Sequence, residues 1–364
     1  MSAPIRVAYA VEQCWHDTPG GTAVAALAVA DELLRRDDVD LRFVAGKHPV
    51  PPRPPYVPGG PVAMLPLARP WLYEAWTRLN WPKVESVTGA VDVVHATGLI
   101  PAATASPLVV TLHDVAFVHS PEKFTKHGAR VMQRSLAVMR RRAAKIVCSS
   151  QATFDDLVDL GVAADRLRLV PLGVDANVVI DDDAVARVRQ ALDLPERFVL
   201  FVGTIEPRKN LRRLSEAMAA IQRTCDDALP LVVCGADGWG DVEVSTDADV
   251  RFVGFRTDDE LHALYAAATV FAYPSEREGF GLPVLEAMAR GCPVVTSRGT
   301  STEEVAGGAA VLVDPFDVES IEAGIATALD DSEAMVERGR RRAAEMTWGV
   351  AAERTLAVYR EVAS

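Results

Sequence analysis

The stretch from 270 to 288 constrains the fold of this chain most, because three kinds of local structure follow one another in it. Residues 270–273 form an apolar run, which predicts a buried parallel strand. Gly279-Phe280-Gly281 predicts a tight loop, and Leu282 followed by Pro283 predicts the first turn of a helix. A strand that leads through glycines into a helix is typical of anion sites, because backbone N–H groups and the positive end of the helix dipole meet there.

Two carboxylates stand eight positions apart in this stretch. Glu278 precedes the glycine loop, and Glu286 lies about one turn into the predicted helix. Carboxylates accept hydrogen bonds from sugar hydroxyls, so the pair could bracket a polyhydroxylated ligand that carries a phosphate. The alternative is an amphipathic helix start with a solvated glutamate.

Residues 278–297, EGFGLPVLEAMARGCPVVTS, resemble the retaining glycosyltransferases of family 4. The resemblance implies an α/β chain with the GT-B fold, in which two doubly wound Rossmann-like domains face each other and a C-terminal helix crosses back to the N-terminal domain. It also implies that Glu278 holds hydroxyls of the donor sugar and that Glu286 holds the ribose of the nucleotide. The same donor site would include Gly279, Phe280, Gly281 and Leu282.

A chain of 364 residues is long enough for two domains of ordinary size. With the resemblance, residues 1–173 are expected to form an N-terminal acceptor-binding domain. Residues 174–346 are expected to form a C-terminal domain that binds the nucleotide sugar, and residues 347–364 the helix that returns to the N-terminal domain.

Composition and charge narrow the class of protein. The formal net charge of −12 argues against a general nucleic-acid binder. Five scattered cysteines without a C-x-x-C predict reduced thiols, as in a cytoplasmic protein. No apolar run reaches membrane-spanning length, and the first residues predict a strand rather than a signal peptide. No His/Cys/Asp spacing predicts a metal site.

A second motif, which contains two cations, lies near the start of the C-terminal half. The apolar run 198–203 predicts a strand, and Arg208 and Lys209 follow it just before a predicted helix. Cations at such a helix start oppose the dipole unless an anion lies in front of them. The resemblance assigns this pair to the donor diphosphate, although many relatives carry a further arginine where this chain has Thr204. Which of the two cations contacts which phosphate is therefore open.

Three candidates lie in the N-terminal half. Gly20-Gly21 falls in a predicted loop, 12–22, and is either a plain tight turn or, by resemblance, a backbone approach to the donor diphosphate. His113 follows the predicted strand 108–112, and the resemblance places it beside the donor sugar, with Asp114 as its neighbour or an acceptor contact. His16 is a weaker candidate on the acceptor side.

Aromatic and basic side chains leave alternatives open. Trp71, Trp76 and Trp81 fall near helical spacing, which indicates either core packing or a surface that faces the acceptor or dips into a membrane. The basic run 134–145 is either a solvated helix face or a contact for anionic lipid or acceptor. The proline-rich segment 49–61 predicts a surface loop.

The expected reaction is transfer of a hexose from a nucleoside diphosphate sugar to an acceptor hydroxyl with retention of configuration. GDP-mannose and UDP-hexoses both fit as donors, and the acceptor is a saccharide, a lipid-linked sugar or a small molecule. No metal cofactor is expected, because Arg208 and Lys209 can meet the charge of the leaving phosphate. The alternatives are a nucleotide-sugar epimerase and a non-catalytic sugar-nucleotide binder. The oligomeric state is open, and peripheral contact with a membrane is an alternative to a purely cytoplasmic location.

Overall fold

The computed structural model describes residues 3–17, 19–121, 125–224, 229–236, 238, 240 and 242–364. The chain divides into two compact units. Unit 1 comprises Met1–Gly173 and Trp348–Ser364, and unit 2 comprises Val174–Thr347. No helix in the described ranges is both long and apolar enough to cross a bilayer.

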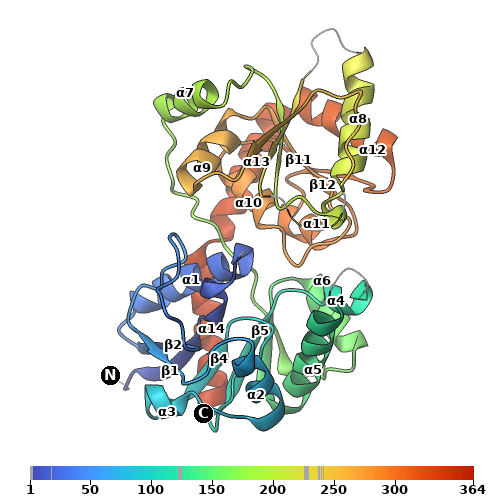
Figure 1. The fold of residues 1–364 in the computed structure, drawn as a ribbon. Coiled ribbons are helices and arrows are strands. Elements are labelled where there is room, and N and C mark those ends of the chain that lie inside the picture. The colour runs from blue at the N-terminus through green and yellow to red at the C-terminus, as the bar shows by residue number, and fades with distance from the viewer. Residues whose placement is uncertain are drawn as a thin grey trace. The chain divides into compact units, whose positions relative to one another are not determined.

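Unit 1 is built on a seven-stranded parallel sheet with the order β3-β2-β1-β4-β5-β6-β7 (Figure 1). Successive side chains of a strand point to opposite faces, and both faces of this sheet are covered, which explains its nearly continuous apolar runs. The strands are β1 (Ile5–Ala10), β2 (Val39–Ala45), β3 (Val62–Met64), β4 (Val93–Ala96), β5 (Leu108–Leu112), β6 (Ala143–Cys148) and β7 (Leu167–Leu169).

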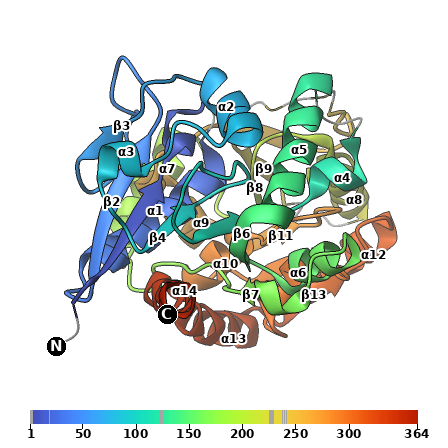
Figure 2. The ribbon, with the colours of Figure 1, turned by 90° about the horizontal axis from the view of Figure 1, so that it is seen from below.

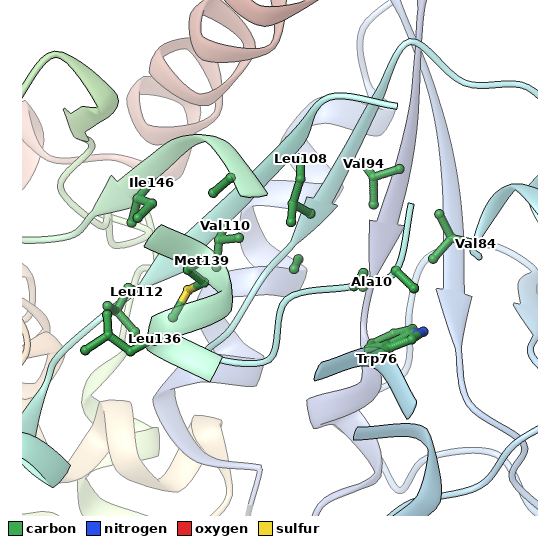
Figure 3. Close-up of a cluster of buried hydrophobic side chains, with 14 of the residues drawn as sticks. Ala10, Trp76, Val84, Val94, Leu108, Val110, Leu112, Leu136, Met139 and Ile146 are labelled. Atoms are coloured by element: carbon green, nitrogen blue, oxygen red, sulfur yellow. The ribbon is translucent and has the colours of Figure 1, made fainter. Parts of the chain in front are cut away.

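Two hydrophobic clusters lie on the two faces of this sheet. One cluster joins Val7 and Tyr9 of β1 to α1 and α14, and the other joins Ala8 and Ala10 of β1 to side chains of α2, α5 and α6 (Figures 1 and 2). Figure 3 shows the second cluster, with Trp76 of α2 at one end. The helices are α1 (Gly20–Leu34), α2 (Trp71–Leu79), α3 (Glu85–Thr88), α4 (Ala116–His119), α5 (Lys126–Arg142), α6 (Gln151–Asp159) and α14 (Trp348–Ala363).

The last helix of the chain belongs to unit 1. Tyr359 of α14 is fully buried, and its hydroxyl lies 2.6 Å from Nδ1 of His95 on β4. Nε2 of the same histidine lies 2.8 Å from the hydroxyl of Thr111. Burial lowers the pKa of His95 to about 3, so the ring is neutral at physiological pH. A neutral, fully partnered histidine thus fixes the helix on the sheet.

Unit 2 repeats the architecture with a six-stranded parallel sheet in the order β10-β9-β8-β11-β12-β13. Its strands are β8 (Val199–Val202), β9 (Leu231–Cys234), β10 (Val250–Gly254), β11 (Val270–Tyr273), β12 (Val294–Ser297) and β13 (Val311–Val313). Its helices are α7 (Asp182–Ala191), α8 (Leu211–Thr224), α9 (Asp258–Ala267), α10 (Leu282–Ala289), α11 (Ser301–Ala306), α12 (Val318–Asp330) and α13 (Ser332–Glu345). The predicted α/β architecture with two doubly wound sheets is confirmed.

Some local predictions need correction. Gly20 and Gly21 do not lie in a loop but form the first turn of α1, where Gly20 has a φ of +58°. The strand β3 and the helices α7 and α11 were not predicted from the sequence pattern. β3 and α11 are short, and short elements carry too few residues to show a period.

Core packing and surface exposure, the two interpretations of the aromatic segment 71–81, each hold for some of its tryptophans. Trp76 is 1% exposed and donates its indole N–H to the carbonyl of Pro82, so it packs in the core. Trp71 is 70% exposed and Trp81 53% exposed. A 3.6-residue period places these side chains on different faces of one short helix and its end, so core packing and surface exposure each hold for part of the segment.

The cysteines in the described ranges are buried free thiols. They are Cys14, Cys148, Cys234 and Cys292; Cys225 lies outside the described residues.

Candidate active site

The strand order of unit 2 locates a ligand site before any side chain is considered. β8 and β11 are neighbours, and the sheet grows from β8 towards β9 and β10 but from β11 towards β12 and β13. Open α/β sheets bind ligands outside the carboxyl ends of the two strands at such a reversal. Lys209 follows β8, and Glu278 follows β11, so the two predicted residues lie in the segments that come after the two strands of the reversal.

Glu278 is the centre of a buried ion cluster. Its Oε1 accepts hydrogen bonds from Nζ of Lys209 at 2.6 Å and from the hydroxyl of Tyr273 at 3.0 Å. Its Oε2 accepts a hydrogen bond from Nη1 of Arg208 at 2.9 Å. The side chains of Glu278 and Lys209 are only 7% and 9% exposed. The sequence motifs 208–209 and 278, which are about 70 positions apart, thus meet in one place.

The charges of this cluster hold the carboxylate ionised. Burial by itself would raise the pKa of Glu278, but the positive charges of Lys209 and Arg208 and their hydrogen bonds lower it to about 2. Burial lowers the pKa of the Lys209 ammonium, and the negative charge of Glu278 opposes that effect. A carboxylate that stays charged at all physiological pH values is a strong acceptor for hydroxyl groups.

Glu206 is a member of the cluster that the sequence analysis did not single out. Its side chain is 8% exposed and forms an ion pair with Arg208, in which Nη2 of the guanidinium lies 2.6 Å from Oε1 of Glu206. Nη1 of Arg208 also donates to the carbonyl of Arg277 at 3.1 Å. The two cations are therefore balanced by two carboxylates, Glu206 and Glu278.

The glycine loop is shaped for a close backbone approach. Gly281 caps α10 with a φ of +110°, a conformation that residues with a Cβ rarely adopt. A Cβ on Gly281 would lie 2.7 Å from Cγ2 of Thr302. Ser301 donates a hydrogen bond to the carbonyl of Glu278 and fixes the loop from the other side. Among the described residues no side-chain hydrogen bond caps α10, so no capping side chain takes up the backbone N–H groups at the start of the helix.

The second predicted carboxylate lies in a different environment. Oε2 of Glu286, on α10, accepts a hydrogen bond at 3.0 Å from the hydroxyl of Tyr265, a fully buried residue of α9. Burial raises the pKa of Glu286. Glu286 thus lacks the direct cation contacts of Glu278 among the described residues, and the two glutamates have different partners although both belong to one motif.

Unit 1 has its own reversal of strand order, between β1 and β4. A buried polar network lies at the carboxyl ends of these strands. Nε2 of Gln13 donates to the hydroxyl of Thr97 at 2.6 Å. The carboxylate of Glu12 accepts from the backbone N–H of Gly46 at 2.6 Å and from Nε2 of His48 at 3.1 Å. These groups were not predicted, because the strands that bring them together are distant in sequence.

His113 stands directly after β5, as predicted. Its carbonyl accepts a hydrogen bond from the hydroxyl of Thr153 at 2.7 Å, and its buried Nδ1 has no partner among the described residues. Burial lowers the pKa of His113. Asp114 accepts a hydrogen bond from the backbone N–H of Ala116 at 3.0 Å, so it closes the turn that begins α4.

His16 is tied into unit 1 by Tyr73, whose hydroxyl lies 2.8 Å from its Nε2. Burial lowers the pKa of His16 to about 4, so the ring is neutral at physiological pH. A Cβ added to Gly20 would meet no atom of the described residues within 4 Å, so close approach to another part of unit 1 does not explain this glycine. The positive φ of Gly20 explains why a glycine occupies this position.

The comparisons with known proteins agree with this geometry. The model of "Glycosyltransferase Family 4" matches residues 19–178, and that of "Glycosyl transferases group 1" matches residues 182–345. O-antigen chain mannosyltransferase B of Escherichia coli is 35% identical over 265 residues, which cover 69% of this chain and 70% of that protein. The chain belongs to the family 4 glycosyltransferases. MMP alpha-(1->4)-mannosyltransferase of Mycolicibacterium hassiacum is 32% identical over 300 residues, covering 74% of this chain and 71% of that protein.

Solved structures show the fold of this glycosyltransferase over its whole length. HepE of Anabaena, in complex with UDP and glucose, superposes with a TM-score of 0.71 at 19% identity, covering 98% of this chain and all of that one. Sucrose-phosphate synthase of Thermosynechococcus elongatus gives a TM-score of 0.72 at 21% identity, covering 99% of each chain. The predicted GT-B fold and the predicted enzyme class, a hexosyltransferase, are confirmed.

Proposed function

We propose that this glycosyltransferase transfers a hexose from a nucleoside diphosphate sugar to an acceptor hydroxyl with retention of anomeric configuration, with GDP-mannose as the first candidate donor. Two relatives named as mannosyltransferases support mannose as the sugar. A UDP-hexose is the competing donor. The acceptor is a saccharide, free or lipid-linked, or a small molecule.

The observation that carries this proposal is the ion cluster at the β8–β11 reversal. In this proposal Lys209 and Arg208 contact the leaving diphosphate, together with the start of α10, which has no side-chain cap. Glu278, held ionised between them, would accept hydrogen bonds from hydroxyls of the donor sugar. Glu286 would hold the ribose, and the segment 279–282 would line the same donor site. Unit 2 is accordingly the nucleotide-sugar unit in this proposal.

In the proposed reaction, the bond between the anomeric carbon and the phosphate oxygen breaks, and the acceptor oxygen bonds to the anomeric carbon on the same face. The proton of the acceptor hydroxyl passes to the departing phosphate, and the products are a glycoside and a nucleoside diphosphate. Lys209 and Arg208 stabilise the negative charge that builds on the diphosphate. Because these side chains supply the positive charge, we propose that no metal cofactor is needed.

Unit 1 supplies the acceptor side in this proposal. His113, at the carboxyl end of β5, would lie beside the donor sugar, with Asp114 shaping its turn. His16 is the weaker acceptor candidate, because Tyr73 already occupies one of its ring nitrogens. Gly20 and Gly21 would approach the diphosphate through the first turn of α1.

Thermal unfolding in the presence of GDP-, UDP-, ADP- and dTDP-sugars tests the donor assignment. A donor at a hundred times its Kd stabilises the fold by about 2.7 kcal/mol, so one nucleotide should raise the Tm selectively. Lys209→Ala should abolish that rise and lower turnover about a hundredfold or more. Arg212→Ala is the matched control, since this nearby cation is 51% exposed and pairs with Glu216. A rise that survives Lys209→Ala, or no rise with any nucleotide sugar, contradicts the proposal.

We also propose a peripheral contact between unit 1 and anionic lipid. Leu79 and Trp81, at the end of α2, are 71% and 53% exposed, and Arg140 and Arg141, at the end of α5, are exposed as well. Exposed apolar side chains and exposed cations on one unit favour an anionic membrane surface. Cosedimentation with phosphatidylglycerol vesicles, reduced by high salt and by the Arg140→Ala/Arg141→Ala pair, is the expected result. Equal recovery with neutral phosphatidylcholine vesicles would contradict it.

A further inference from the structure

Unit 1 contains a pocket of about 350 Å³ that shares His48 with the polar network of Glu12. Its walls come from three parts of the chain. Trp15 follows β1, His48 follows β2, and the remaining lining belongs mainly to the proline-rich segment 49–58. Gly60, Val62 and Met64 complete it, and Val62 and Met64 pair in register with Phe43 and Ala45 of β2. The pocket therefore runs along β3 to the carboxyl edge of the sheet, the edge on which His113 also lies.

The pocket is remote from His113 along that edge. The sheet order places β2 three strands away from β5, which His113 follows. Neighbouring strands lie about 4.8 Å apart, so β5 is separated by about 14 Å from β2, which His48 follows, and by about 10 Å from β1, which Trp15 follows. Both separations exceed the width of one sugar ring. A ligand that occupies both places must be an extended molecule.

An aromatic pair forms one wall. The rings of Trp15 and His48 stack with centroids 4.5 Å apart and an interplanar angle of 7°. Hydrogen bonds fix both rings: the indole N–H donates to the carbonyl of Val50 at 2.8 Å, and His48 is bonded to the buried carboxylate of Glu12. A fixed indole is a suitable platform for the apolar C–H face of a sugar ring.

The proline-rich part of the lining offers more hydrogen-bond acceptors than donors. Pro49, Pro51, Pro52 and Pro58 have carbonyl groups but no N–H, and the N–H of Val57 is already donated to the carbonyl of Pro55. No lining side chain carries a permanent charge, and the carboxylate behind His48 disfavours an anion. The ligand must therefore bring its own donors and an apolar face. A neutral saccharide brings both, whereas a phosphate brings acceptors and an acyl chain brings no donors.

We infer that this pocket binds a neutral sugar residue of an oligosaccharide acceptor, away from the hydroxyl that reacts. The inference rests on the proposed function, because it assigns the acceptor class of that reaction. It makes the enzyme sensitive to acceptor length, because only a longer acceptor reaches both His113 and Trp15. The growing end would lie at His113, and an earlier residue of the glycan would stack on Trp15.

Direct binding tests the inference without any turnover. Tryptophan fluorescence of the full chain is titrated with neutral tetrasaccharides of mannose and of glucose, with mannose 6-phosphate and with a short alkyl glycoside, all without donor. A neutral tetrasaccharide should change a signal that Trp15→Phe removes. No change with any neutral saccharide, a change that persists in Trp15→Phe, or a stronger response to mannose 6-phosphate or the alkyl chain overturns the inference.

Kinetics give a second readout. With GDP-mannose as donor, the KM of the wild type should fall by about tenfold between a mannose disaccharide and a tetrasaccharide, the size of one good aromatic contact. Trp15→Ala should bring this ratio close to one, and Val158→Ala, an exposed apolar residue of α6 outside the pocket, should leave it intact. A Tm measured for each variant identifies one that fails to fold. If transfer occurs without length dependence, the assignment of the pocket to the acceptor is wrong but the proposed function stands. If no nucleotide sugar supports transfer, the proposed function itself is wrong.

Discussion

The pair formed by Lys209 and Glu278 should be strongly coupled, and a double-mutant cycle measures the coupling. Unit charges 4 Å apart attract by about 4 kcal/mol at an effective dielectric constant of 20, so charges at the observed 2.6 Å attract by roughly 6 kcal/mol. Desolvation offsets part of this attraction. Removing one partner of a buried pair still costs about 3–5 kcal/mol, because the other charge stays buried without it.

The cycle uses Lys209→Met and Glu278→Gln, which keep the shapes of the side chains. For a unit of this size 1 kcal/mol corresponds to about 2–4 °C, so each single change should lower the Tm of unit 2 by about 6–20 °C. Lys209→Met should lie near the lower limit, because Arg208 still contacts Glu278 at 2.9 Å. The double variant buries no unpaired charge and should regain at least half of the larger loss.

Thermal unfolding followed by circular dichroism gives the coupling, and transfer assays on the same samples separate stability from chemistry. The double variant should be stable yet inactive, because both side chains are assigned to the donor. The exposed pair Arg212 and Glu216, at 2.8 Å, is the control cycle and should show less than about 1 kcal/mol of coupling. If the losses of the two buried single variants simply add, the reasoning is refuted.

Three further outcomes are expected. Folded unit 1 keeps His95 neutral with a pKa of about 3, while the unfolded ring gains a proton below 6.5, so His95 should contribute about 1.4 kcal/mol per pH unit to the fall in stability below pH 6.5, in addition to the contributions of His16 and His113. Unfolding at pH 7 and pH 5 measures the total slope, and His95→Gln should reduce that slope by about the share of one histidine. Trp76→Ala should cost about 3–5 kcal/mol and Trp71→Ala less than about 0.5 kcal/mol in urea unfolding; similar costs would contradict the burial assignment. Gly281→Ala should raise the donor KM and lower the Tm, because its φ of +110° and the methyl group of Thr302 oppose a Cβ; unchanged values for both would exclude that strain.

Local sequence patterns were sufficient to predict most of the architecture. Buried parallel strands read as apolar runs, and the glycine loop before Leu282 predicts a helix start wherever the segment lies in space. The candidate residues Glu278 and Lys209 were found because their motifs are local and are typical of a known family. The helix α14 shows an amphipathic pattern that needs no partner to be recognised.

Only the tertiary structure decided which side chains meet. Arg208 forms ion pairs with Glu206, two positions away, and with Glu278, seventy positions away. The second pair forms because β8 and β11 are neighbours in the sheet. In the same way, Trp15 stacks on His48 because β1 lies beside β2. The burial of Trp76 depends on which face of α2 packs against the sheet. Strand order is a property of the whole chain, so contacts that depend on it leave no signal in any short stretch of sequence.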